Sequence, residues 1–499
     1  MISTSLHELL DAQLGDLYIQ GTRVETLEKK DDVQMTSVVT DSRQAQAGSI
    51  FVAIAGERVD GHDFVTGLSE DVALAVVDHL IDGAAVPQLL VENTVRALGD
   101  IARLNIQKRR AFAARGMNEF TIIGITGSVG KTTTKDMLHA VLSRLAPTVA
   151  PQGSFNNDIG LPLTALQVDE KTRFFVAEMG ASAKGEIAYL TTIARPDISI
   201  VLKVGVAHLG GFGSVEGIRD AKSEIVRALT SSGVAILNAD DSYVRTMAEM
   251  TKASSIIWFS RQSAEDQPKP KVSGMVSSVI VRGTDTHVDE DNRAKFSVQL
   301  PDGTSFDLRL GIRGEHNVFN ALAVLSVVYS LDIPEHIAAS VLSQMSTISA
   351  HRMHVAEVTR GEASFTVIDD SFNANPDSMR AGLNALASYK KADEGLLRVA
   401  VLGAMLELGS GEEDAHRRIG LYAAEHADAV IAVGSSEDEN LTRLAACLAD
   451  GAGQKAQLVA NTHEANALVE KLAQQHRAVV LLKGSHASGL SALASEWIH

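Results

Sequence analysis

The sequence predicts an α/β protein of three domains, and three observations support this. Its 499 residues are about three times the length of a typical domain. Short apolar runs alternate with amphipathic segments, a pattern typical of parallel sheets with helical crossovers. A glycine-rich stretch at 124–134 joins one such run to a helix-like segment. We therefore expect a central, mostly parallel P-loop-type sheet with helices on both faces, a Rossmann-like C-terminal domain and a smaller N-terminal α/β domain.

The N-terminal domain is expected over residues 1–115. Short strand-like runs precede a helix predicted at 95–110, and the polar stretch 110–119 is expected to be a linker. The central domain is expected over 116–348. Its strand–helix alternation gives way to an alternating β-type pattern over 272–310, which predicts strands added to the main sheet.

The C-terminal domain is expected over 349–499. Its apolar runs at 399–403, 429–434, 457–460 and 478–482 are separated by helix-like segments. Buried strands that alternate with helices predict a second parallel sheet.

The composition excludes several classes of protein. A formal charge of −17 argues against a nucleic-acid binder, which needs a basic face. A single cysteine, Cys447, excludes a disulfide framework and a multi-cysteine zinc site. The N-terminal segment does not read as a secretory signal, and we find no apolar run long enough to span a membrane. We expect a cytoplasmic protein with no membrane insertion.

The strongest local signal is the stretch 126–134, TGSVGKTTT, which follows an apolar run and opens a helix. Glycines let backbone N–H groups approach a phosphate, and a helix N-terminus adds partial positive charge. Lys131 is placed to reach terminal phosphates and Thr132 to ligate Mg²⁺. Ile125 stands where the strict pattern has its first glycine, so a purely structural loop stays open.

A phosphate loop alone does not distinguish a motor, a switch, a kinase or a ligase. No asparagine is followed by lysine, which argues against a guanine-specific switch. Glu178 ends a buried run and is a candidate Mg²⁺ ligand; the alternative is a carboxylate that caps the next helix. Taken singly, His208 fits a structural hydrogen bonder and Lys222 a solvated helix lysine.

In combination these motifs resemble the Mur ligase family, the ATP-dependent amide-bond formers of peptidoglycan synthesis. Its loop reads Thr-Gly-x-x-Gly-Lys-Thr, which accounts for Ile125. The resemblance spans the chain through the stretches TGSVGKTTT (126–134), SFNNDIGLP (154–162), EMGASAKGEI (178–187), GVAHL (205–209), AKSEI (221–225) and GEHNVFNA (314–321). The stretch 41–64 resembles the family's uridine-nucleotide domain. The stretches 368–379 and 401–409 resemble the branch that adds D-alanyl-D-alanine.

The resemblance implies an ATP-dependent carbon–nitrogen ligase that joins D-alanyl-D-alanine to UDP-N-acetylmuramoyl-tripeptide through an acyl phosphate, with Mg²⁺ as cofactor. It implies catalytic roles for Lys131, Glu178, His208 and Lys222. The metal ligands that it implies are Thr132, Glu178, His208 and Lys222, with the lysine present as a CO₂-derived carbamate. It implies ATP contacts from Gly127, Ser128, Val129, Gly130, Lys131, Thr132, Thr133, Asn317, Arg352 and Asp370, and UDP-substrate contacts from Ser42, Arg43, Asn156, Asn157 and Ser182.

Four positions depart from the family pattern: Gly210, Phe372, Ala404 and His486. Positions 404 and 486 therefore carry no assigned role in holding the dipeptide. The alternatives left open are another Mur-type ligase, a folylpolyglutamate synthase-like ligase, and an ATP-dependent switch or scaffold. We expect a monomer whose domains move relative to one another. The sequence does not identify the third peptide residue of the substrate.

Overall fold

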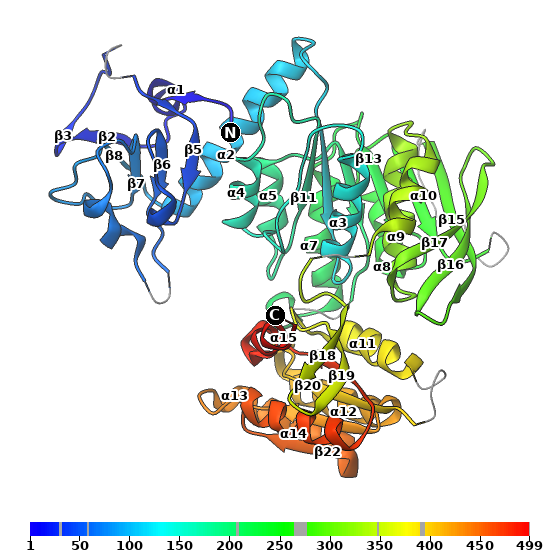
Figure 1. The fold of residues 1–499 in the computed structure, drawn as a ribbon. Helices are drawn as coiled ribbons and strands as arrows, with labels where there is room; N and C mark the ends of the chain where they lie inside the picture. Colours follow the sequence, from blue (N-terminus) through cyan, green and yellow to red (C-terminus); the bar gives the residue numbers. More distant parts are fainter. Residues whose placement is uncertain are drawn as a thin grey trace.

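A computed structural model describes residues 1–28, 32–56, 59–205, 209–263, 277–346, 349–389 and 395–498. These residues build three main sheets, each with its own helices, in the order of the chain (Figure 1). The expected three-domain α/β architecture is confirmed. Within these ranges, no helix has both the length and the apolar character needed to cross a membrane.

The first sheet has the strand order β3-β2-β8-β7-β6-β5, with β5 to β8 parallel and β2 and β3 antiparallel. A short pair, β1 with β4, lies beside it. The strands are β1 (Thr4–Ser5), β2 (Asp16–Ile19), β3 (Thr22–Arg23), β4 (Gln34–Met35), β5 (Ser37–Val39), β6 (Ser49–Val52), β7 (Leu74–Val77) and β8 (Gln88–Leu90); the helices are α1 (Leu6–Asp11), η2 (Ser42–Gln44) and η3 (Gly61–Gly67).

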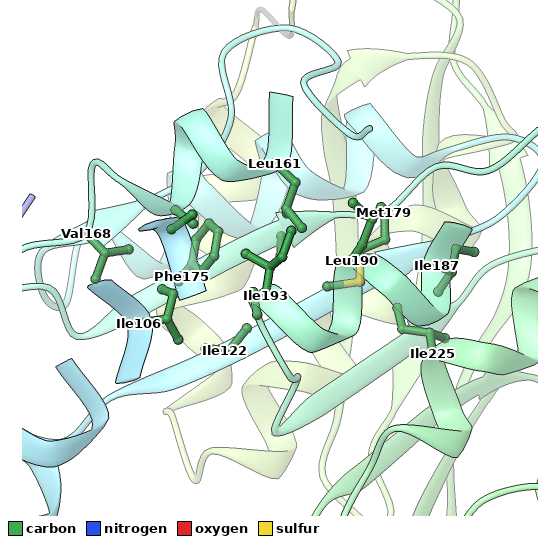
Figure 2. Packing of buried hydrophobic residues seen from close by; sticks show 14 of the residues in the cluster. Ile106, Ile122, Leu161, Val168, Phe175, Met179, Ile187, Leu190, Ile193 and Ile225 are labelled. Atoms are coloured by element: carbon green, nitrogen blue, oxygen red, sulfur yellow. The ribbon is translucent and has the colours of Figure 1, made fainter. Parts of the chain in front are cut away.

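Helix α2 (Thr94–Ala114) connects this sheet to the central domain. Asn93 is its N-cap, and the Asn93 side chain accepts the Arg96 N–H at 2.8 Å. Its buried face, including Ile106, packs against Ile122 and Phe175 of the central sheet, as Figure 2 shows. One hydrophobic cluster therefore runs from the N-terminal sheet into the central domain.

The predicted linker at 110–119 is wrong in its first half, because α2 continues through it to Ala114. Arg110 bonds the Asp197 carboxylate at 3.1 Å, which ties this turn of the helix to the central domain. The polar pattern of the segment reflects these surface ion pairs rather than a break in the helix.

The central sheet has the order β10-β11-β9-β12-β13-β14-β15-β16-β17. Pairing is parallel from β10 to β15 and antiparallel from β15 to β17, which confirms the predicted added strands. The strands are β9 (Thr121–Thr126), β10 (Thr148–Val149), β11 (Phe174–Glu178), β12 (Ile198–Val201), β13 (Val234–Asn238), β14 (Ser255–Ser260), β15 (Ser277–Val288), β16 (Arg293–Gln299) and β17 (Ser305–Arg313).

Helices cover both faces of this sheet. Helix α3 packs with α9 and α10 on one face, and α5 packs with α7 on the other. The helices are α3 (Lys131–Leu142), α4 (Gly160–Ala165), α5 (Glu186–Ile193), α6 (Leu209–Phe212), α7 (Val215–Arg227), α8 (Ser242–Thr246), α9 (Asn317–Ser330) and α10 (Glu335–Gln344), with η4 at Met247–Glu249.

The C-terminal sheet has the order β18-β19-β23-β20-β21-β22, parallel except for β18. Its elements are β18 (His354–Arg360), β19 (Ala363–Asp369), α11 (Pro376–Ser388), β20 (Leu397–Leu402), η6 (Gly409–Gly411), α12 (Glu412–His426), β21 (Ala429–Val433), α13 (Glu439–Ala452), η7 (Gly453–Lys455), β22 (Ala456–Val459), α14 (Thr462–Gln475), β23 (Ala478–Lys483), η8 (His486–Ser488) and α15 (Leu490–Ile498).

The central and C-terminal domains touch along the ends of their sheets. Lys203 forms an ion pair with Asp377 at 3.3 Å, and the Gly210 N–H donates to the Glu407 carbonyl at 3.2 Å. The carboxyl ends of parallel strands are where α/β sheets bind ligands, and β9, β11 and β12 all present theirs at this junction.

Candidate active site

The predicted phosphate loop lies between β9 and α3, at the carboxyl edge of the central sheet. Gly130 has φ +86°, and a Cβ there would lie 2.5 Å from the Asn320 side-chain oxygen, so both conformation and space require glycine. The Lys131 ammonium folds back and donates to the Gly127 carbonyl at 2.8 Å. Burial lowers the pKa of Lys131; Glu178 opposes the shift and Arg352 adds to it.

The segment that follows β12 holds the loop in place through two hydrogen bonds to Ser128. The Ser128 N–H donates to the Lys203 carbonyl at 2.9 Å, and its hydroxyl accepts the Gly205 N–H at 2.9 Å. Helix α3 starts directly at Lys131, so the side chains of Thr132 and Thr133 stand in its first turn. The resulting arrangement, a glycine loop at a helix N-terminus, suits an anionic phosphate.

Glu178 ends β11 next to the loop and is fully buried. Its Oε1 accepts from the Asn156 amide at 2.7 Å and from the Thr132 hydroxyl at 3.3 Å. Its Oε2 has no hydrogen-bond partner in the described part of the chain. A buried carboxylate oxygen without a partner is costly, and a bound cation would satisfy it. The donor set of hydroxyl and carboxylate oxygens fits Mg²⁺.

Arg352 reaches this cluster from the far side of the domain junction. Its guanidinium lies 3.3 Å from the Ser154 hydroxyl and 3.5 Å from the Thr132 hydroxyl. It stacks over the Phe372 ring at 4.4 Å, and the ring centroids of Phe372 and His486 are 6.4 Å apart. Two of the departures from the family pattern, at 372 and 486, therefore meet beside the phosphate loop.

Lys222 lies on α7 and is only 3% exposed, so the solvated-lysine alternative is wrong. Burial, and to a lesser degree the Lys131 charge, lower the pKa of Lys222 to about 7. A large fraction of this amine is therefore neutral at physiological pH. His208 falls outside the described residues.

Asn317 and Asp370 each form a hydrogen bond or ion pair with another side chain near the phosphate loop. Asn317 Oδ1 accepts from Asn320, and Asn320 in turn accepts from the Thr134 hydroxyl at 3.2 Å, a chain that joins α9 to α3. Asp370 pairs with the buried Lys483 at 2.5 Å. The sequence reasoning gave no role to Lys483 or Asn320. The position of Lys483 at the end of a buried apolar run could have marked it as a candidate site residue.

A cavity of about 240 Å³ opens at the junction of the central and C-terminal domains. Three arginines, Arg293, Arg313 and Arg352, line it. The Arg313 carbonyl also accepts from the Asn317 amide at 2.7 Å, so this cavity borders the start of α9.

The five residues assigned to the UDP substrate do not gather in one place. The Asn156 amide donates to Glu178, whereas the Asn157 side chain accepts the Gly160 N–H at 2.8 Å, at the start of α4. Ser182 bonds the exposed Glu186 carboxylate. Ser42 and Arg43 lie in the N-terminal domain, on η2, where the Arg43 side chain is 88% exposed and its guanidinium pairs with Asp41.

A glycine loop between a strand and a helix, an acidic residue on the neighbouring strand and an arginine from a second domain define a nucleotide-dependent α/β enzyme. Family models match in three segments: "Mur ligase family, catalytic domain" at 34–121, "Mur ligase middle domain" at 125–328, and "Mur ligase, glutamate ligase domain" at 351–486. The chain belongs to the Mur ligase family.

Curated relatives and solved structures match this chain over nearly its full length. The UDP-N-acetylmuramoyl-tripeptide–D-alanyl-D-alanine ligase of Mycobacterium tuberculosis strain H37Rv is 36% identical, over 98% of this chain and 97% of its own. The ligase of the same name from Escherichia coli K12 is 31% identical over the same shares. A crystal structure of MurF from Acinetobacter baumannii superposes with a TM-score of 0.81, at 31% identity over 99% of each chain.

Proposed function

We propose that this protein joins D-alanyl-D-alanine to UDP-N-acetylmuramoyl-tripeptide with hydrolysis of ATP to ADP and phosphate. The observation that carries the proposal is the full-length similarity, at up to 36% identity, to ligases of that name. The phosphate loop, the buried Glu178 and the inter-domain Arg352 supply the matching chemistry.

The reaction begins with an acid that is a poor acyl donor. The terminal carboxylate of the tripeptide attacks the γ-phosphorus of ATP, the bond from that phosphorus to the β–γ bridging oxygen breaks, and ADP leaves. The amine of D-alanyl-D-alanine then attacks the acyl carbon, phosphate leaves, and the nitrogen loses a proton. Positive charge at the phosphate oxygens stabilises the first transition state.

Lys131 supplies that charge from the phosphate loop. Its bond to the Gly127 carbonyl would be exchanged for a phosphate oxygen when ATP binds, which costs little because one hydrogen bond replaces another. Arg352 reaches the same region from the C-terminal domain, so docking of the two domains completes the set of cations and excludes water from the acyl phosphate. Asn317 and Asp370, at the edges of the junction, are assigned to the base and ribose.

Thr132, Glu178, His208 and a carbamate on Lys222 are the residues that would hold Mg²⁺. The ion supplies positive charge against the phosphate oxygens. The neutral amine of Lys222 attacks CO₂, a nitrogen–carbon bond forms, and the nitrogen loses its proton to leave a carbamate anion. A buried lysine with a pKa of about 7 is suited to this step, because only the neutral amine is a nucleophile. Ser42 and Arg43 are assigned to the uridine diphosphate.

The test is ADP release with UDP-N-acetylmuramoyl-tripeptide, with and without D-alanyl-D-alanine. We expect turnover only with both, and a product heavier by the dipeptide less one water. Equal ADP release without the dipeptide would favour a switch or scaffold. Turnover with a pterin polyglutamate substrate instead would favour a folylpolyglutamate synthase-like ligase.

A further inference from the structure

Three side chains of metal-ligating types meet in the N-terminal domain, and none of them belongs to the residues assigned to the reaction above. His62 lies at the start of η3, and Asp78 and His79 directly follow β7. One ligand atom from each lies within 4.8 Å of the others. Among the described residues, no other group of three histidine, cysteine, aspartate or glutamate side chains lies so close together.

His62 is held in one orientation before any ion arrives. It is 4% exposed, and its Nδ1 lies 2.6 Å from the Asp60 carboxylate, which also accepts the His62 backbone N–H at 2.9 Å. Its Nε2 faces the backbone N–H of Asp78 at 3.3 Å, which makes Nε2 the acceptor nitrogen. A histidine that donates one ring N–H to a carboxylate and offers the other nitrogen is the usual form of a metal ligand.

The Asp78 carboxylate lies between the ring nitrogens of the two histidines. His62 Nε2 lies 3.2 Å from Asp78 Oδ1, and the same oxygen lies 2.7 Å from His79 Nδ1. The two imidazole rings stack with centroids 4.5 Å apart. Without a metal ion, a ring N–H of His79 donates to the Asp78 carboxylate, and a metal ion that binds here takes the place of that proton. The side chains of Asp78 and His79 are 39% and 60% exposed, so an ion can enter from solvent.

We propose that His62, Asp78 and His79 form a binding site for a divalent ion of the Zn²⁺ class, with Asp60 as the positioning residue. Two imidazole nitrogens and one carboxylate oxygen select Zn²⁺ over Mg²⁺, which prefers oxygen ligands. Three protein ligands leave a fourth position for water or an anionic oxygen. The site lies beyond the carboxyl ends of β6 and β7, the same sheet edge that carries Ser42 and Arg43.

The experiment is a Zn²⁺ titration of the full-length protein against a chromophoric chelator, with millimolar Mg²⁺ present to fill oxygen-rich sites. We expect the wild type to take up one equivalent of Zn²⁺ that His79→Ala binds at least tenfold more weakly. Asp60→Asn should weaken binding by about 10–100-fold, since it removes the carboxylate behind His62. His7→Ala, an exposed histidine of the same domain, should bind as the wild type does.

Two results would overturn the proposal. One is equal Zn²⁺ uptake by the wild type and His79→Ala. The other comes from the histidine ring NMR signals: if Zn²⁺ leaves those of His62 and His79 unshifted, a proton rather than a metal bridges the cluster. Because His79 is exposed, its alanine variant should have the same Tm as the wild type when Zn²⁺ is absent. When Zn²⁺ is added, only the Tm of the wild type should rise.

Discussion

The buried Lys222 makes a prediction about stability that is independent of turnover. Its pKa is about 7 in the folded protein, against 10.5 for a free lysine, so between these values the unfolded chain binds a proton that the folded chain does not. Stability therefore rises with pH across this window, and the cost of burying the ammonium is present in full below pH 7. Lys222→Met removes the cost at about the same side-chain volume.

The magnitude follows from the two pKa values. Burial of Lys222 costs about 4 kcal/mol at pH 7 and about 1 kcal/mol at pH 10, a difference of about 3 kcal/mol. For a domain of this size each kcal/mol shifts Tm by about 2–4 °C. The variant should therefore melt above the wild type at pH 7, and that gap should shrink by about 6–12 °C at pH 10.

The assay is thermal unfolding of both proteins from pH 7 to pH 10 in buffer freed of CO₂, so that no carbamate forms. Lys252→Met, at an exposed lysine, is the matched control and should follow the wild type at every pH. A constant gap in Tm between Lys222→Met and the wild type would refute the reasoning. The same variant should lose turnover, because methionine cannot form a carbamate.

Three further substitutions test the phosphate loop and the buried carboxylate of Glu178 beside it. Lys131→Ala should lower ADP release by about 1,000-fold or more without lowering Tm substantially, because the lost bond to the Gly127 carbonyl is offset by the removal of a buried ammonium; retained turnover would move the nucleotide site elsewhere. Glu178→Gln keeps an acceptor for Asn156 but removes the charge, so turnover should fall about 100-fold or more and require more Mg²⁺, and an unchanged Mg²⁺ titration would contradict the ligand role. Gly130→Ala should raise the KM for ATP, because its Cβ would lie 2.5 Å from the Asn320 side chain at φ +86°; an unchanged KM would show that the loop adapts.

The sequence predicts the local parts of the site well, because chain neighbours make them. The loop from Gly127 to Thr133 follows from a strand, glycines and a helix start, and all three are visible in the sequence. Glu178 follows from its place at the end of a buried run. The burial of Lys222 could also be predicted from the sequence. Ile218 lies four residues before it, Ala221 one residue before it and Ile225 three residues after it. This spacing places the lysine on the apolar stripe of α7.

Contacts between distant segments could not be predicted in the same way. Arg352 reaches Thr132 across 220 positions, and Lys483 pairs with Asp370 across 113. Nothing in the local pattern fixes how the two sheets face each other, so the partners of these side chains emerge only with the fold. The prediction of a linker from residue 110 was wrong for a related reason. Arg110 lies within α2, which ends at Ala114, and its charge serves an ion pair with Asp197, 87 positions away in the sequence.

Helix α2 has a consequence for which substrates the enzyme can use. Its 21 residues span about 31 Å, and its apolar face is embedded in one hydrophobic cluster with the N-terminal and central domains. A helix held in this way acts as a spacer of fixed length between η2 and the phosphate loop. If Arg43 anchors the uridine diphosphate, as proposed above, this fixed length sets the distance from that anchor to the γ-phosphate of ATP. A peptide one residue too short would leave its carboxylate short of the γ-phosphate, and one residue too long would fold past it.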